Sequence, residues 1–133
     1  MSTKPKMARL EHVNITVADA DAKAARLCDL FGWHIRWQGE AMNGVGKTIH
    51  VGGDDFYLAI YSPHAGTDAP ARSSYLTHGG LNHVAVVVDD IDAMEKRVAA
   101  AGYEPGNHGD YEPGRRFYYH DEDGIEFEVV SYD

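Results

Sequence analysis

The sequence has 133 residues and a formal net charge of −9. A chain of this length can bury one core without disulfides or a structural metal. The acidic balance disfavours nucleic acid and anionic membranes as partners, since both demand a basic face. No segment approaches the roughly 20 apolar residues that a membrane span needs. A single cysteine, Cys28, excludes an internal disulfide, and the first ten residues lack the apolar run of a signal peptide, so we expect a cytoplasmic protein.

An internal repeat organises the chain. Residues 10–28 (LEHVNITVADADAKAARLC) match residues 81–99 (LNHVAVVVDDIDAMEKRVA), each residue lying 71 positions before its counterpart. The segments FYLAIYS (56–62) and IEFEVVS (125–131) also match, 69 positions apart. A duplicated unit that cannot close its own core is expected to pack against its twin. We therefore expect one domain, 1–133, made of two modules at about 8–62 and 80–133 and a linker at about 63–79.

The first module is predicted to have the order βαβββ. Alternating apolar residues predict an opening strand with its valines on one face and His12 on the other. The helix that follows can be capped by Asp19 or Asp21 and is expected to end at Gly32. The three remaining strands are predicted at 33–38, 47–51 and 56–61, with the turn GGDD between the last two.

The second module repeats this order. Its opening strand again alternates, with the valines on one face and His83 on the other. Its helix is predicted to begin after Asp90 and to end at Gly102. Its remaining strands are predicted at 103–107, 115–120 and 125–130, with the turn DEDG between the last two.

The same alternation assigns polar side chains to the face of each sheet that does not carry the helix, which we call the open face. The two opening strands send His12 and His83 to this face. The other strands are expected to send the following residues there: Thr48, His50, Tyr57, Ala59, Tyr61, Glu126 and Glu128. If the polar residues of the two strands of the last hairpin face each other, Arg116, Tyr118 and His120 lie beside Glu126 and Glu128. Thr48 is expected opposite Ala59 in the first module.

Two imidazoles and one carboxylate are thereby predicted to converge: His12, His83 and Glu128. Such a set suits Fe(II) or Mn(II) and is compatible with Zn(II). A lone histidine on a strand is more often structural than a ligand, but the repeat puts both histidines at the same place in their modules. The fourth equivalent position holds Ala59, which cannot bind a metal.

The openings EHVNITVAD and NHVAVVVDD and the ending YYHDEDGIEFEVV resemble the vicinal oxygen chelate superfamily, which includes glyoxalases, bleomycin resistance proteins and extradiol dioxygenases. The resemblance covers nearly the whole chain. It implies an α+β, glyoxalase-like fold, in which two tandem βαβββ modules pair into an incomplete eight-stranded barrel with helices outside. It also implies one divalent metal per site (Fe, Mn, Zn or Ni), a small-molecule substrate and a homodimer.

Ala59 departs from part of this superfamily. Lactoylglutathione lyases and methylmalonyl-CoA epimerases keep a Glu or Gln at its position, and that residue takes part in proton transfer. Extradiol dioxygenases and fosfomycin thiol transferases work with three ligands. Tyr118 also resembles the tyrosine that extradiol enzymes carry before their last ligand, whereas the position of their acid–base histidine is about Phe56. The three-ligand set therefore favours dioxygenase-like chemistry.

The remaining candidates fill supporting roles. His50 could act as a substitute fourth ligand or as an acid–base group, and Tyr57, Tyr61 and Arg116 are candidate substrate-binding residues. Glu126 is interpreted as pairing with Arg116 or His120. Two alternative functions stay open: a lyase or epimerase with a base that is not a ligand, and a metal-free, bleomycin-resistance-type binding protein.

Overall fold

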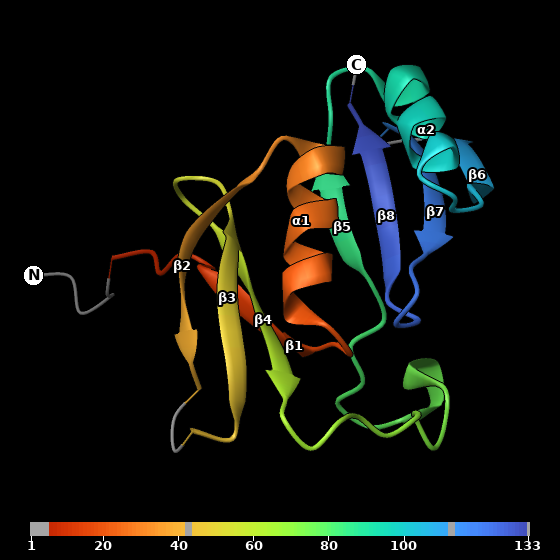
Figure 1. Ribbon diagram of the computed structural model, residues 1–133. Coiled ribbons are helices and arrows are strands. Elements are labelled where there is room, and N and C mark those ends of the chain that lie inside the picture. Colours follow the sequence, from red (N-terminus) through yellow and green to blue (C-terminus); the bar gives the residue numbers. More distant parts are fainter. Residues whose placement is uncertain (1–5, 42–43, 112–113, 133) are drawn as a thin grey trace, which may run out of the picture. The chain divides into compact units, whose positions relative to one another are not determined.

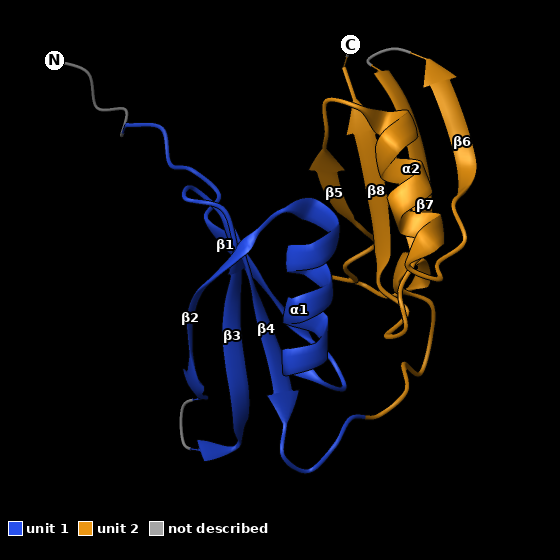
Figure 2. Cartoon of the chain, turned by 45° about the horizontal axis from the view of Figure 1, so that its top comes forward, with its two compact units in different colours: residues 1–67 blue, residues 68–133 orange. Residues whose placement is uncertain are grey.

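The computed structural model describes residues 6–41, 44–111 and 114–132 (Figure 1). The chain divides into two compact units, residues 1–67 and 68–133 (Figure 2). Among the helices of the described segments, none is long and apolar enough to cross a membrane.

The first unit has the order βαβββ. Its elements are β1 (His12–Thr16), α1 (Ala20–Phe31), β2 (His34–Glu40), β3 (Gly46–Gly52) and β4 (Tyr57–Pro63). The four strands form one sheet in the order β1-β4-β3-β2. β1 runs parallel to β4, and the other two pairings are antiparallel.

The second unit repeats this order. Its elements are β5 (Val84–Val87), α2 (Ile91–Ala100), β6 (Gly106–Tyr111), β7 (Gly114–His120) and β8 (Glu126–Ser131), preceded by a short 3-10 helix at Ser74–Leu76. Its sheet has the order β5-β8-β7-β6, again with the first and last strands parallel. The two tandem βαβββ modules are confirmed, and their pairing into an eight-stranded barrel stays a prediction.

Both helices begin and end near the predicted residues. Asp19 caps α1, its side chain accepting a hydrogen bond from the backbone N–H of Ala22 at 3.1 Å. Gly32 ends α1 in the left-handed conformation, with φ of 70°, which a residue without a Cβ adopts at low cost. Asp90 caps α2 in the same way, accepting from Ala93 at 3.0 Å. Of the two candidate caps for the first helix, the structure therefore selects Asp19.

The core of each unit lies between its helix and one face of its sheet. In the first unit, α1 contacts β3 and β4, and the following apolar residues are buried: Ala24, Leu27, Ile49, Val51, Leu58 and Ile60. In the second unit, Ile91 and Val98 of α2 are buried, as are Phe117, Phe127 and Val129 of the sheet. The predicted faces are correct at these positions, so the residues that alternate with them along each strand lie on the opposite, open face.

β6 lies further along the chain than predicted. The sequence predicted a strand at 103–107, whereas β6 spans Gly106–Tyr111. Tyr103 is still engaged in the turn that ends α2, because its backbone N–H donates to the carbonyl of Val98 at 3.2 Å. The Tyr103 ring also stacks on Tyr119, with ring centroids 5.2 Å apart. Because of these contacts, β6 begins at Gly106 and not at Tyr103 as predicted.

Removal of the Asp90 cap tests the account of α2. Asp90→Ala is expected to lower the free energy of unfolding by about 0.5–2 kcal/mol, because an orphan N–H of the first turn loses its acceptor. Urea denaturation measures this change. Asp89→Ala is the matched control, since it removes the neighbouring carboxylate outside the cap position. Equal losses in the two variants would contradict the assignment of the cap.

Candidate metal centre

His83 and Glu128 lie together in the second unit. His83 immediately precedes β5, and the parallel register of β5 and β8 pairs Ala85 with Glu128. His83 Nε2 lies 3.2 Å from Glu128 Oε1. Two donors that bind one ion at about 2.1 Å and at right angles are about 3.0 Å apart. The spacing of this imidazole and this carboxylate therefore fits two adjacent ligands of a single ion.

Arg116 holds the other oxygen of Glu128. Its Nη1 donates to Glu128 Oε2 at 2.9 Å, its Nη2 donates to the carbonyl of Gly114 at 3.3 Å, and its guanidinium lies 4.8 Å from the centre of the Tyr111 ring. Glu128 is only 7% exposed. A carboxylate this deeply buried needs a partner of opposite charge. Arg116 supplies that charge and leaves Oε1 directed at His83.

The register of the last hairpin agrees with the prediction. Tyr118 pairs with Glu128, and His120 pairs with Glu126. The Tyr118 ring meets the His83 ring edge-on, with centroids 5.8 Å apart. Burial, followed by the nearby charge of Glu128, raises the pKa of Tyr118 above its ordinary value. Tyr118 therefore keeps its proton at neutral pH and can donate a hydrogen bond beside the candidate centre.

Glu126 contacts three side chains. Its Oε2 lies 3.5 Å from His120 Nε2, and its Oε1 lies 3.6 Å from His83 Nδ1. Oε1 also accepts a hydrogen bond from the hydroxyl of Tyr75 at 2.5 Å. The expected pairing with His120 is therefore present, whereas Arg116 pairs with Glu128 instead. Tyr75 lies in the 3-10 helix of the predicted linker, where no sequence pattern indicated a role.

His12 lies in the first unit, at the start of β1. Its Nδ1 lies 2.8 Å from Glu11 Oε1, and its ring stacks on Tyr57 with centroids 4.6 Å apart. The hydroxyl of Tyr57 donates to the same Glu11 oxygen at 3.3 Å. Hydrogen bonding to His12 is the main cause that lowers the pKa of Glu11 below its ordinary value. Glu11 is not among the predicted site residues, because it precedes the strand and alternation does not assign it to a face.

His50, rather than Thr48, lies opposite Ala59. β3 and β4 pair His50 with Ala59 and Thr48 with Tyr61, so the predicted pairing was wrong. The sequence predicts the turn at residues 52–55, but Gly52 joins the strand and pairs with Tyr57. A side chain at Gly52 would collide with the Phe56 carbonyl, its Cβ only 2.4 Å away, so glycine permits this closer pairing. This shift of register brings the imidazole of His50 beside Ala59, which holds the fourth equivalent position of the ligand set.

The registers also show that His50 and Tyr118 are equivalent positions of the repeat. His50 pairs with Ala59 as Tyr118 pairs with Glu128. The His50 ring stacks on Tyr57 at 4.4 Å and is tilted against Trp37 at 5.0 Å. Desolvation, aided by the charges of His12 and Arg36, lowers the pKa of His50. His50 is therefore a neutral imidazole at neutral pH.

The predicted ligands are divided between the two units. His83 and Glu128 belong to the second and His12 to the first, and the convergence of all three stays a prediction. Within the described segments, no group of three or more His, Cys, Asp or Glu side chains is arranged to hold a metal. Of the candidate substrate-binding residues, Tyr57 contacts His12 and His50, Tyr61 lies two residues from Ala59 on β4, and Arg116 contacts Glu128.

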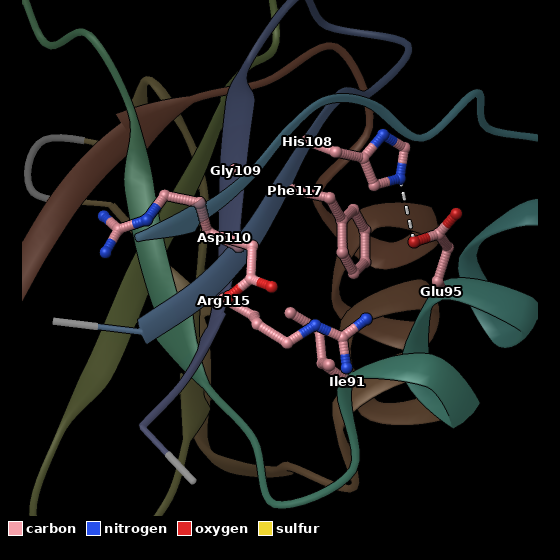
Figure 3. Close-up of a pocket in the computed structure, with 8 residues that line it drawn as sticks. Ile91, Glu95, His108, Gly109, Asp110, Arg115 and Phe117 are labelled. Carbon is pink, nitrogen blue, oxygen red and sulfur yellow. Dashed lines mark hydrogen bonds and ion pairs between the residues drawn. The ribbon is translucent and has the colours of Figure 1, made fainter. Parts of the chain in front are cut away.

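A separate pocket of about 260 Å³ lies in the second unit (Figure 3). It is lined by Glu95 of α2 and by His108, Arg115 and Phe117 of β6 and β7. His108 Nε2 lies 2.9 Å from Glu95 Oε1 across this pocket. Neither His83 nor Glu128 lines it, but Arg116, which binds Glu128, does.

Comparison with known proteins identifies the family. The family model described as the Glyoxalase/Bleomycin resistance protein/Dioxygenase superfamily matches residues 9–129. The chain therefore belongs to this superfamily, as its resemblance implied. None of the curated proteins compared matches the sequence significantly.

Solved structures share the fold. A glyoxalase/bleomycin resistance protein/dioxygenase domain from Frankia sp. EAN1pec is 20% identical with a TM-score of 0.78, over 96% of this chain and 100% of that one. A variant of the fosfomycin resistance protein FosX from Listeria monocytogenes, complexed with Mn(II) and 1S,2S-dihydroxypropylphosphonic acid, is 20% identical with a TM-score of 0.71, over 93% and 92%. An antibiotic-binding protein from a Streptomyces species is 16% identical with a TM-score of 0.73, over 98% and 100%. Proteins of this fold thus include one that was solved with Mn(II) and one that binds an antibiotic.

Two adjacent arginines allow a test of the Glu128 environment. Arg116→Met is expected to lower the free energy of unfolding of the metal-free protein by about 3 kcal/mol, because it leaves a buried carboxylate without its partner. Arg115→Met, which breaks an exposed pair with Asp92, is expected to cost less than about 1 kcal/mol. Chemical denaturation of both variants measures the difference. Equal effects would show that Glu128 does not depend on Arg116.

Proposed function

We propose that this protein is a divalent-metal-dependent enzyme that binds small substrates through two neighbouring oxygen atoms. His12, His83 and Glu128 are its proposed ligands. The observation that carries the proposal is the distance of 3.2 Å between His83 Nε2 and Glu128 Oε1, with Arg116 occupying only the other oxygen of Glu128. His12 occupies the place in the first module that His83 occupies in the second.

The proposed chemistry divides between the ion and the surrounding residues. A divalent ion held by this set would supply Lewis-acid polarisation of two vicinal oxygens. Three protein ligands leave several coordination positions for a bidentate substrate and a further small molecule, which favours dioxygenase-like chemistry with Fe(II) or Mn(II). The metal identity, the substrate and a homodimeric assembly are parts of this proposal.

Two residues are proposed to handle protons. His50 is neutral, since its pKa is lowered, and can accept a proton at the position beside Ala59. Tyr118 keeps its proton, since its pKa is raised, and can donate a hydrogen bond next to His83. Tyr57 and Tyr61 would line the substrate site. Arg116 would act on substrate only indirectly, by orienting Glu128.

The alternative within the enzymes is a lyase or epimerase. Ala59 supplies no carboxylate there, so such a reaction would have to recruit Glu128, His50 or a metal-bound hydroxide as its base, and we propose His50. The register favours this residue, because it places His50 directly opposite Ala59.

A metal-free binding protein is the second candidate. One observation favours it: His12, Tyr57 and His50 form a stack of nearly parallel rings, and Arg36 lies over Tyr57 at 4.6 Å. Such a surface suits a planar ligand. Metal content separates this candidate from the enzyme.

Substitution of His83 tests the ligand assignment. His83→Ala is expected to lose bound Mn(II) or Zn(II) with little loss of fold, because the buried apolar face of the sheet does not include it. Elemental analysis after dialysis measures the metal, and circular dichroism measures the fold. His108→Ala, which removes an imidazole paired with Glu95, is the matched control and should keep the metal. Full occupancy in His83→Ala would contradict the assignment.

Substrate screening tests the reaction class. The wild-type protein is expected to convert the methylglyoxal–glutathione hemithioacetal poorly, even when loaded with Zn(II) or Ni(II), because Ala59 cannot abstract a proton. Catechols with the Fe(II)-loaded protein are the complementary screen, followed by oxygen consumption. A kcat/KM for lactoylglutathione formation in the usual enzymatic range of roughly 10⁴–10⁸ M⁻¹s⁻¹ would contradict the expectation. In that event His50→Ala should reduce the rate by about 10²–10⁴-fold, as loss of a general base does.

A further inference from the structure

Each of the two candidate histidines has a carboxylate facing its Nδ1, and each carboxylate is bound by a tyrosine. In the first unit, Glu11 Oε1 lies 2.8 Å from His12 Nδ1 and accepts from the hydroxyl of Tyr57 at 3.3 Å. In the second unit, Glu126 Oε1 lies 3.6 Å from His83 Nδ1 and accepts from the hydroxyl of Tyr75 at 2.5 Å. The same three functional groups therefore meet in the same order in both units.

The internal repeat does not account for this arrangement. Glu11 precedes β1 and is the chain neighbour of His12, whereas Glu126 lies on β8, far along the chain from His83. The counterpart of Glu11 in the repeat is Asn82, and the tyrosines come from β4 in one unit and from the 3-10 helix in the other. The two arrangements thus use different elements to present a carboxylate to the same ring atom.

The chemistry of this contact selects one form of the imidazole. An ionised carboxylate can only accept hydrogen bonds, so Nδ1 of His12, which lies 2.8 Å from Glu11 Oε1, carries a proton. In a neutral imidazole, the proton on Nδ1 leaves the lone pair on Nε2. His83 has a carboxylate near both ring nitrogens, since Nε2 lies 3.2 Å from Glu128 Oε1 and Nδ1 lies 3.6 Å from Glu126 Oε1. A metal bound by Nε2 and Glu128 would leave Nδ1 as the protonated nitrogen, which faces Glu126. A carboxylate behind a ligating histidine fixes its tautomer and orientation and increases its basicity as a ligand.

We propose that Glu11 and Glu126 are positioning residues that hold His12 and His83 with Nδ1 protonated and Nε2 free to bind a metal, and that Tyr57 and Tyr75 hold the two carboxylates in place. This inference rests on the proposed metal site. It adds a role for the segment between the modules, because Tyr75 links that segment to β8 through Glu126.

Metal affinity of three variants tests the proposal. Glu126→Gln and Glu11→Gln keep a side-chain oxygen of similar shape but remove its charge, and each is expected to weaken Zn(II) binding about 10–100-fold. Tyr75→Phe should weaken it less, because Glu126 retains its charge. Competition with a chromophoric chelator measures the dissociation constants. Glu122→Gln is the matched control, since Glu122 also accepts a hydrogen bond from a tyrosine, Tyr103, but lies outside the proposed ligand set.

A spectroscopic readout separates positioning from general support of the fold. Long-range ¹H–¹⁵N spectra of the Zn(II)-loaded wild type should show the proton on Nδ1 and metal coordination through Nε2 at both His12 and His83. Coordination through Nδ1, or unchanged Zn(II) affinity in both glutamate variants, would overturn this inference and leave the metal site intact. Failure of the wild type to bind any metal would overturn the proposed function and this inference together.

Discussion

The parallel pairing of the first and last strands of each module is the constraint on which the candidate centre depends. In the second unit it aligns Ala85 with Glu128 and brings His83 alongside β8. A slip of one residue would turn Glu128 toward the helix and bring Phe127 or Val129 to the open face. That exchange would bury a carboxylate in an apolar core, which is costly without a partner. The hydrophobic core thus fixes the register that brings His83 and Glu128 together.

Arg116 resolves a conflict between burial and charge. Burial of Glu128 strengthens its attraction for a cation, but a buried carboxylate without a partner would destabilise the fold. The guanidinium neutralises one oxygen and leaves the other directed at His83. A bound ion and Arg116 would then share a single carboxylate. The positive charge of Arg116 weakens the attraction for a cation, whereas the carboxylates behind the histidines strengthen it.

Much of the fold follows from local patterns in the sequence. Alternation identified the buried face of β4 and β8, and the aspartate and glycine signals located both helices. The last hairpin was predicted in its correct register, because Glu126 and Glu128 pair with polar residues there. The hairpin of β3 and β4 was not, because two consecutive glycines, Gly52 and Gly53, leave the start of a turn undetermined by pattern alone.

The supporting residues of the site were harder to predict. Glu11 lies outside the strand, so no periodicity assigns its direction. Tyr75 lies in a segment that reads as a linker, and its contact with Glu126 crosses 51 residues of chain. Long-range contacts of this kind depend on the tertiary structure, which leaves no local signal in the sequence. The pairing of His50, rather than Thr48, with Ala59 has a different origin, since it depends on where one local turn begins.

The proposed function depends on the binding of one metal ion by His12, His83 and Glu128. Anomalous scattering from crystals of the Mn(II)- or Zn(II)-loaded wild-type protein tests it most directly. We expect one strong peak per site, with His12 Nε2, His83 Nε2 and an oxygen of Glu128 at about 2.0–2.2 Å from it. A peak bound elsewhere, such as at His108 and Glu95, or no peak in protein exposed to the metal, would contradict the claim.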